Sequence, residues 1–403
     1  MPYRADRSAV SIDTARAILA VHGEPLTRIE RVALDAAAGR VAAQNIYASI
    51  DVPPFSRAAM DGYAVKAADT ITATHGAPAR LTLVESIFTG AVPTRTLQSG
   101  ECAAIATGAP MPAGADSVVM LERSKVHGST VMLLETARPG QHVGVAGGDL
   151  VAGELAIAEG TVLSPARIGV AAALGLADLD VFARPRVAIL STGDEIVAPG
   201  DRLGPGQIFD ANSASLAAAV TAHGGEPVLQ PRVRDDREAL TTAFSAALGE
   251  QMVLFCGGSS VGERDYSLEI LGALGTVLFE GLLLKPGKPT IFAIVNGVPV
   301  FGLPGNPVSC LTNAYLFVAP MLRRMAHLPP PYERVVAATL SQDVSSPPGR
   351  HQVYPVRLEG DTAVPVFKSS GEITSLASAD GFFQIPADVE HVDAGTRVHV
   401  VLF

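Results

Sequence analysis

Acidic side chains follow three strand-like runs in the central part of the chain. Glu195 follows "VAILST", Asp235 and Asp236 follow "QPRV", and Asp265 closes a glycine-rich loop after "MVLFC". In an open parallel sheet, ligands bind beyond the carboxyl ends of the strands, so these carboxylates would converge if the strands are neighbours. Carboxylate oxygens suit a hard divalent cation. The alternative is structural, because the paired aspartates suit a helix N-terminus and Asp265 suits a helix N-cap.

The glycine-rich loop itself reads "CGGSSVGERDY" from 256 to 266. Its backbone at Gly257 and Gly258 lacks Cβ atoms and can approach a phosphate, and the hydroxyls of Ser259 and Ser260 add donors. The loop matches neither G-x-G-x-x-G nor G-x-x-x-x-G-K-[ST], the two common phosphate motifs. On the glycines alone, a phosphate loop and a plain tight turn are both open.

Two further segments favour an anionic ligand. "KPGKPT" at 285–290 presents Lys285 and Lys288 between prolines that restrict the backbone, which suits an oxyanion better than a mobile pair of lysines would. "GLPGNPVS" at 302–309 leads into a predicted helix, whose N-terminal N–H groups attract anions. The alternatives are a solvated turn for the first segment and a helix cap made by Asn306 or Ser309 for the second.

The elements that must position these loops alternate between strand and helix from residue 186 onward. Buried-type strands alternate with helical patterns, including one that begins at Asn212 or Ser213 and stops at Gly224. Asn296-Gly297 predicts a hairpin turn, and 307–326 reads as a closing helix. This order predicts a doubly wound parallel α/β domain over roughly 180–327.

The segments on either side of this domain do not show the strand–helix alternation. Ser11–His22 and Ser164–Gly175 read as helices, the second capped by Ser164, with Pro165 at its first position. Between them, short strands are separated by glycine and proline turns. After a proline linker at 329–331, short β runs predict a small all-β domain to the C-terminus.

Composition narrows the class of protein. A chain of 403 residues is expected to hold more than one domain. Its formal net charge of −10 argues against broad nucleic-acid binding. Its three cysteines are far apart, which favours small buried residues over a disulfide framework or zinc cluster. No signal peptide and no uninterrupted apolar stretch of about 20 residues is found, so a cytoplasmic protein without membrane spans is expected.

Nine segments, in this order, give the chain a resemblance to the molybdopterin molybdenumtransferase family, whose eukaryotic relative is the E domain of gephyrin. Each is weak alone, but the ordered set is specific and spans about residues 11–380. The segments are "PPFSRAAMDGYAV", "TGAPMPAGAD", "GGDL", "STGDEIV", "GQIFDAN", "RDD", "GGSSVGERDY", "KPGKP" and "GLPGNPVS".

The resemblance implies a homodimer of four-domain subunits. It implies a discontinuous helical linker domain (1–48 and 141–179), an inserted mostly β domain (49–140), a molybdopterin-binding α/β domain (180–327) and a C-terminal β-barrel (328–403). It also implies that molybdate is inserted into adenylylated molybdopterin with release of AMP and with Mg²⁺ as cofactor. The active site would lie between the α/β domain of one subunit and the inserted domain of the other. A molybdopterin adenylyltransferase and molybdoenzymes are further partners that the family suggests.

The resemblance also carries roles onto individual positions. The catalytic acids would be Asp61, Asp149, Glu195, Asp235 and Asp265, with Glu195 and Asp265 holding the metal. The lysines of "KPGKP" would face molybdate, and the glycine loop would bind the pterin phosphate. The expected substrate-binding residues are Thr107, Gly257, Gly258, Ser259, Ser260, Lys285, Lys288, Pro304, Gly305, Asn306, Ser309 and Arg350.

The chain departs from the family pattern at a few positions. Ser56 and Ala58 replace an Asp and a Ser that commonly precede "AMDGY", and Gly148 replaces an acid. Residues 144–146 are Gly-Val-Ala where bacterial members often carry arginines. Two other functions are therefore kept beside the transferase: a molybdopterin adenylyltransferase, which shares the α/β fold, and a non-catalytic pterin carrier or scaffold.

Overall fold

The computed structural model describes residues 9–234, 236–257, 266–331 and 334–403. The chain divides into two compact units, which are described separately below. The first comprises residues 1–30, 39–41 and 181–403, and the second comprises 31–38 and 42–180. Within the described ranges, no helix is long and apolar enough to cross a membrane. The four-domain division stays a prediction.

The first unit is built around a six-stranded sheet in the order β16-β13-β17-β21-β20-β18. The four strands from β16 to β21 run parallel, whereas β20 and β18 are antiparallel to their neighbours. Asn296 and Gly297 have φ angles of 51° and 82°, as the predicted β20–β21 hairpin turn requires. The strands are β13 (Arg186–Ser191), β16 (Glu226–Leu229), β17 (Met252–Cys256), β18 (Thr276–Glu280), β20 (Ile291–Val295) and β21 (Val298–Leu303).

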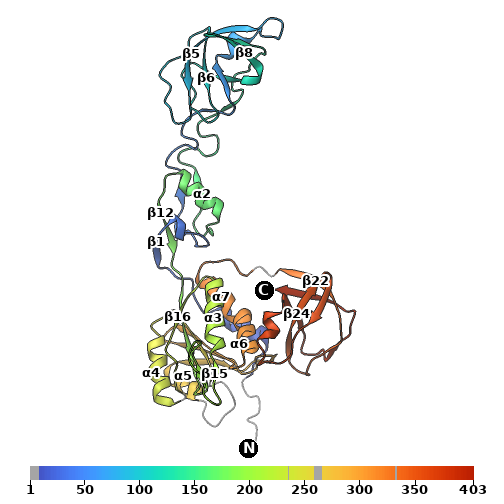
Figure 1. Ribbon diagram of the computed structural model, residues 1–403. Coiled ribbons are helices and arrows are strands. Elements are labelled where there is room, and N and C mark those ends of the chain that lie inside the picture. Colours follow the sequence, from blue (N-terminus) through green and yellow to red (C-terminus); the bar gives the residue numbers. More distant parts are fainter. Residues whose placement is uncertain (1–8, 235, 258–265, 332–333) are drawn as a thin grey trace, which may run out of the picture. The chain divides into compact units, whose positions relative to one another are not determined.

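Helices cover both faces of this sheet, so the predicted doubly wound α/β fold is confirmed. Alternate residues of a strand point to opposite faces, and Ile189 packs in one apolar core whereas Leu190 packs in the other. The first core contains residues of α3 (Ala211–Ala222) and α6 (Pro307–Asn313). The second contains residues of α4 (Arg237–Ala247) and α5 (Tyr266–Leu274), and Figure 1 labels all four helices.

The start of α3 differs from the prediction. Its N-cap is Asp210, whose carboxylate accepts a hydrogen bond from the Ser213 N–H at 2.9 Å. The expected cap, Asn212 or Ser213, is therefore wrong. Asp210 satisfies the cap earlier in a run of residues that all suit this position, which leaves the Asn212 side chain available for a contact elsewhere.

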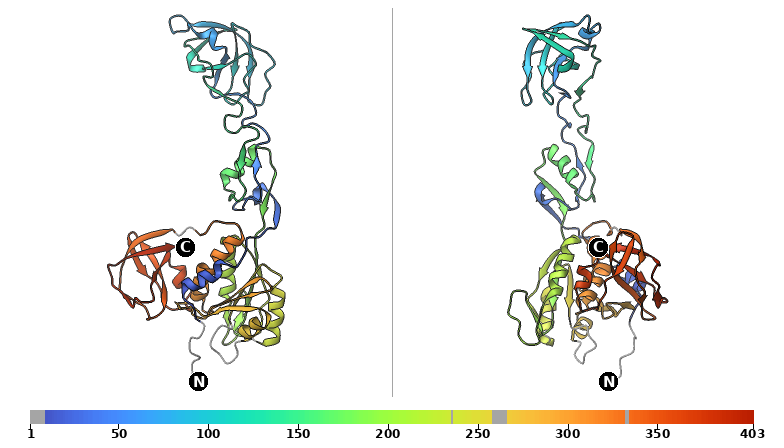
Figure 2. Two further views of the ribbon diagram at one scale, coloured as in Figure 1. Left: turned by 180° about the vertical axis from the view of Figure 1, so that it is seen from behind. Right: turned by 45° about the vertical axis from the view of Figure 1, so that its right-hand side comes forward.

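The predicted closing helix is present but irregular. α6 continues into a π-helical turn, Ala314–Val318, and then into α7 (Ala319–Met325). Pro320 lies at the start of α7, and a wider turn before it accommodates a residue without an N–H group. Helix α1 (Ile12–Ala20) shares the same apolar core, and Figure 2 shows it in blue beside these orange helices.

The C-terminal segment of this unit forms a closed barrel, as predicted. Pairing runs from β24 through β25, β22, β28 and β26 and returns to β24. A short strand, β19 (Leu284–Lys285), adds to this sheet from the α/β part by pairing with β24. The barrel strands are β22 (Val335–Leu340), β24 (His351–Glu359), β25 (Thr362–Pro365), β26 (Gly381–Ile385) and β28 (Arg397–Leu402).

The second unit is mostly β. Its six-stranded sheet has the order β7-β4-β6-β5-β9-β8 and carries apolar cores on both faces. Its helix α2 (Pro165–Ala173) is capped by Ser164, as predicted. The sheet strands are β4 (Gly62–Val65), β5 (Ala79–Ile87), β6 (Glu101–Ile105), β7 (Ser117–Met120), β8 (Ser124–His127) and β9 (Thr130–Leu133).

Short paired strands complete the two units. They include β14 (Ile196–Val197) with β15 (Ile208–Phe209), and β23 (Val344–Ser345) with β27 (His391–Val392). The others are β1 (Ile29–Ala33) with β12 (Asp178–Phe182), β2 (Ile46–Tyr47) with β11 (Leu155–Ile157), and β3 (Arg57–Ala58) with β10 (Val143–Gly144).

Candidate active site

A pocket of about 650 Å³ opens in the first unit. It contains groups from the sheet, from the loop that precedes β20 and from the barrel, and it includes many of the residues that the sequence predicted. Its lining is Glu195, Gly257, Leu284, Lys285, Pro286, Gly287, Lys288, Pro289, Pro304, Gly305, Asn306, Ser309, Arg350, Phe367, Lys368, Ser369 and Ser370.

The ends of three parallel strands explain why distant residues meet here. Ser191 of β13 pairs in register with Cys256 of β17, which pairs in register with Leu303 of β21. The residues that follow each strand therefore leave the sheet at one edge, which is where ligands bind in such sheets. Glu195, Gly257 and Gly305 all reach the pocket from this edge.

Gly257 is the first glycine of the predicted phosphate loop. Its φ is +98°, and a Cβ atom here would lie 2.4 Å from the Thr192 carbonyl oxygen. Only a residue without a side chain fits so close to the neighbouring strand end. The rest of the predicted loop, Gly258, Ser259, Ser260 and Asp265, lies outside the described residues, and so does Asp235.

The backbone of the "KPGKP" loop is hydrogen-bonded to a buried amide side chain. Asn313 of α6 is fully buried, and its Nδ2 donates to the Gly287 carbonyl at 2.9 Å and to Thr290 Oγ1 at 2.6 Å. The Thr290 hydroxyl in turn donates to the Gly287 carbonyl at 2.9 Å. Such a buried network fixes the backbone that carries Lys285 and Lys288. Nothing in the sequence singles out Asn313, which reads simply as a polar residue within a helix.

A second amide fixes the loop after β21. Asn212 of α3 donates through Nδ2 to the Gly305 carbonyl at 2.8 Å. Asn306, the next residue, donates through Nδ2 to Ser370 Oγ at 2.8 Å, and the Val308 N–H donates to the Ser370 carbonyl at 3.1 Å. The loop is therefore positioned by both the α/β part and the barrel.

The barrel side of the pocket was only partly predicted. The β19–β24 pairing sets Lys285 beside Gln352, and so brings Arg350 to the same pocket. The segment 367–370, "FKSS", also lines the pocket and was missed. Its local signal is a lysine and two hydroxyls before a glycine, but nothing nearby in sequence links it to the strand ends.

The charged side chains that line the pocket are mostly cationic. Within the described part of the chain, the cationic side chains lining the pocket are Lys285, Lys288, Arg350 and Lys368, and the carboxylate is that of Glu195. Lys285 is half-buried and has no acidic partner among the residues that the structure describes. In a chain of net charge −10 this concentration of cations favours an anionic ligand.

Glu195 is the only described member of the predicted metal pair. It is exposed, lines the pocket, and its carboxylate folds back over Gly193. Mg²⁺ keeps several waters and commonly binds one or two protein carboxylates together with substrate phosphates. A single accessible carboxylate beside an anion-attracting pocket fits that donor set.

The remaining predicted residues lie in the second unit. Asp61 accepts hydrogen bonds from the Thr107 N–H at 2.7 Å and from the Thr107 hydroxyl at 3.0 Å, both through Oδ1. These two donors, the backbone one first, hold the pKa of Asp61 below its ordinary value. Asp149 is exposed, and its N–H donates to the Val52 carbonyl at 3.0 Å.

The cysteines are buried and unpaired, as predicted. Burial raises the pKa of the Cys102 thiol to about 12, so this group is not a nucleophile at neutral pH. Cys256 and Cys310 lie with their sulfur atoms 3.5 Å apart in the apolar core beneath the pocket.

Comparisons with known proteins agree along most of the chain. Residues 10–175 match the model of the MoeA N-terminal region (domain I and II), 188–324 match a probable molybdopterin binding domain, and 337–403 match the MoeA C-terminal region (domain IV). Molybdopterin molybdenumtransferase 2 of Mycobacterium tuberculosis is 36% identical over 92% of this chain and 94% of its own length. The enzyme of Bacillus subtilis named molybdopterin molybdenumtransferase is 32% identical over 94% of this chain and 91% of its own length.

Solved structures give the same result. A crystal structure titled as the molybdopterin biosynthesis MoeA protein of Pyrococcus horikoshii superposes with a TM-score of 0.85, at 39% identity, over 98% of this chain and 99% of the other. A second MoeA structure from that organism superposes with a TM-score of 0.81 at 31% identity. The fold, the ordered segments and the relatives together show that this chain belongs to the MoeA family of molybdopterin molybdenumtransferases.

Proposed function

We propose that this chain is a molybdopterin molybdenumtransferase, which inserts molybdate into adenylylated molybdopterin and releases AMP. The family to which it belongs supports this reaction class. The observation that carries the proposal is the pocket at the ends of three parallel strands, where the described lining has four cationic side chains and one carboxylate. Molybdate and the phosphate groups of an adenylylated pterin are both anions that such a pocket would hold.

The lysines are the proposed molybdate ligands. Lys285 and Lys288 sit on a loop that Asn313 and Thr290 fix from the buried side. Groups held in this way need little reorganisation to bind a tetrahedral oxyanion, and hydrogen-bond donors aimed in advance are the effective ones. Arg350 would add a forked donor from the barrel side.

The loop after β21 is the proposed cradle for the other anionic groups. It comprises Pro304, Gly305, Asn306 and Ser309, and its backbone is fixed by Asn212 and Ser370. Gly257 would let the chain approach a phosphate closely. Holding the two anions side by side converts their encounter into a reaction within one complex, which is a large part of the rate in such reactions.

Mg²⁺ is proposed as the cofactor, with Glu195 as one ligand and Asp265 as the other. When bound, the ion would offset phosphate charge and polarise the P–O bond that must break to release AMP. Glu195 itself would orient that ion near the substrate phosphates. Gly258, Ser259, Ser260, Asp235 and Asp265 keep the predicted roles that the family suggests.

The acids of the second unit are proposed to complete the site in a homodimer. The two hydrogen bonds from Thr107 lower the pKa of Asp61 and so favour its carboxylate form. The family resemblance supports an active site in which Asp61, Thr107 and Asp149 come from the partner subunit.

Light scattering would test the dimer, and mixing Asp61→Asn subunits with Lys285→Ala subunits would test the shared site. Partial recovery of activity in the mixture is expected, because half of the sites in a mixed dimer would then carry both intact residues.

The direct test is AMP release from adenylylated molybdopterin by the purified protein with Mg²⁺. AMP that forms only when molybdate is added would support the proposal. Substrate binding without AMP release would contradict it and favour the carrier. Formation of adenylylated molybdopterin from ATP and molybdopterin would instead favour the adenylyltransferase, which the full-length match to transferase relatives argues against.

A further inference from the structure

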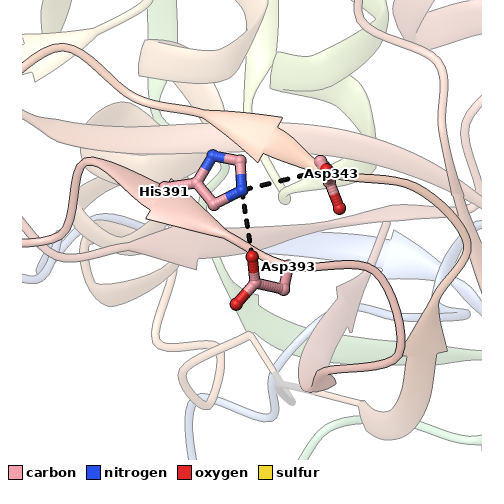
Figure 3. Close-up of side chains that lie close together, drawn as sticks. All are labelled: Asp343, His391 and Asp393. Carbon is pink, nitrogen blue, oxygen red and sulfur yellow. Dashed lines mark ion pairs between the residues drawn. The ribbon is translucent and has the colours of Figure 1, made fainter.

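A second cluster of chemically active side chains lies in the C-terminal barrel part, among residues that do not line the pocket. Asp343, His391 and Asp393 each offer a ligand atom, and these three atoms lie within 4.8 Å of one another. Figure 3 shows both carboxylates turned toward the same nitrogen of the imidazole ring. No residue of this cluster was singled out by the sequence.

The short ribbon formed by β23 and β27 places the three side chains together. In its antiparallel register Val344 lies opposite Val392, and Ser345 lies opposite His391. One residue further along, Asp343 therefore faces Asp393, and both share a face of the ribbon with His391. Like charges directly opposite one another on paired strands are unfavourable, so a cation bound near both carboxylates would be stabilising.

The distances from His391 to the two carboxylates are compatible with a shared ion. His391 Nε2 lies 3.1 Å from Asp393 Oδ1 and 3.9 Å from Asp343 Oδ2. The first distance suits a hydrogen bond, but the second is too long for one. Two ligand atoms of a tetrahedral zinc ion, each about 2.0–2.1 Å from the metal, lie about 3.4 Å apart. The two observed distances bracket that value.

One ligand is already oriented by the backbone. The Ala394 N–H donates to Asp343 Oδ1 at 2.8 Å, so the other oxygen, Oδ2, is the one that faces His391. Hydrogen bonds of this kind commonly fix the ligands of metal sites. The three side chains remain 48–83% exposed, which leaves the outer coordination positions to water.

We propose that Asp343, His391 and Asp393 form a binding site for a divalent transition-metal ion of the zinc type, separate from the substrate pocket. The imidazole nitrogen decides the class of ion, because zinc accepts imidazole and carboxylate ligands together, whereas Mg²⁺ and Ca²⁺ prefer oxygen alone. A bound ion would join Asp343, which precedes β23, to His391 of β27 and to Asp393, which follows β27. The inference does not depend on the proposed transferase function.

The test is calorimetric titration of the chelator-treated full-length protein with zinc chloride. His391→Ala and Asp393→Asn are compared with His399→Ala, which removes another exposed histidine of the barrel part. The wild type and His399→Ala should take up one more zinc ion than His391→Ala does. Asp393→Asn should weaken that binding by about tenfold or more, a loss seen even for residues that only support metal ligands.

A cobalt titration gives a readout specific to the ligands. Visible absorption bands of bound Co²⁺ should appear with the wild type and be lost in His391→Ala. Thermal melts of the metal-free variants check folding, and unchanged melting temperatures are expected because all three side chains are exposed. Equal zinc stoichiometry in the wild type and His391→Ala would overturn the proposal, as would displacement of zinc by a modest excess of Mg²⁺.

Discussion

The pocket and the Asp61–Thr107 contact are two parts of the predicted site that are held in different ways. In the pocket, the loops are positioned by buried amides from other elements, such as Asn313, which is fully buried. Asp61 is exposed and is positioned by one residue, Thr107, through two hydrogen bonds. Changes beneath the pocket should therefore alter stability and binding together, whereas changes at Thr107 should alter only the pKa of Asp61.

The largest effect is expected from Lys285→Ala. Removing one charged donor from a preorganised anion site costs about 100-fold in catalytic efficiency. The free energy of unfolding should change by no more than about 0.5 kcal/mol, because Lys285 has no acidic partner among the described residues. Kinetics of molybdate-dependent AMP release and a urea denaturation curve give the two values.

Lys125→Ala is the matched control for this change, since it removes an exposed lysine of β8 in the second unit. It should leave both values unchanged. Equal activity of the two variants would remove Lys285 from the site. A large loss of stability in Lys285→Ala would mean that this lysine is part of the buried support.

Gly257→Ala tests the close packing of Gly257 against the neighbouring strand end. A left-handed backbone costs any other residue about 1–2 kcal/mol, and the new Cβ would also meet the Thr192 carbonyl at 2.4 Å. Gly200→Ala is the control, because its φ of +100° is close to the +98° of Gly257 but nothing lies within 4 Å of its Cβ. The collision should add about 1–3 kcal/mol to the destabilisation of Gly257→Ala relative to the control. Equal melting temperatures for the two variants would show that the Thr192 carbonyl can move away from the new Cβ without loss of stability.

Asn313→Ala should combine a moderate loss of stability with weaker substrate binding. The change removes two buried hydrogen bonds, to the Gly287 carbonyl and to Thr290 Oγ1, each of which contributes about 0.5–1.5 kcal/mol. The hydrogen bond between Thr290 and Gly287 remains. KM for molybdate should rise, since the loop that carries both lysines loses its support. Asn45→Ala, which removes an exposed amide contact to the Glu159 N–H in the second unit, is the control. A stability loss with unchanged KM would mean that Asn313 stabilises the fold but does not position the lysines for molybdate.

The sequence predicted the parts of this site that depend on local pattern. Strand ends, glycine loops and the hairpin at Asn296-Gly297 each have a signal within a few residues, and the parallel sheet then brings the strand ends to one edge. The α3 cap was misplaced because Asp210, Asn212 and Ser213 all suit that position. No local feature distinguishes them.

The missed residues depend on long-range contacts. Ser370 matters because Asn306, far away in the sequence, donates to it. Asn313 matters because a loop from another part of the chain packs on α6. Neither position carries a pattern of its own, and such pairings are set by the tertiary fold rather than by periodicity. The zinc-type cluster is a similar case, because Asp343 and His391 meet only when β23 pairs with β27.

The smallest effect, and the sharpest contrast with the pocket, is expected from Thr107→Val. It removes the hydroxyl donor to Asp61 and keeps the N–H donor, so the pKa of Asp61 should rise part of the way toward its ordinary value of 3.8. Because the folded-state pKa is lowered, the contact stabilises the fold above the ordinary pKa and loses that effect as the pH falls through the folded-state value. Stability at neutral pH should change little, since both groups are exposed.

A carboxyl-carbon NMR titration of Asp61 measures the shift, with Thr136→Val as a variant that loses a hydroxyl elsewhere in the same unit. An unchanged titration of Asp61 in Thr107→Val would mean that the backbone donor alone holds the charge. A large stability loss at neutral pH would show that this surface contact supports the fold as the buried amides do.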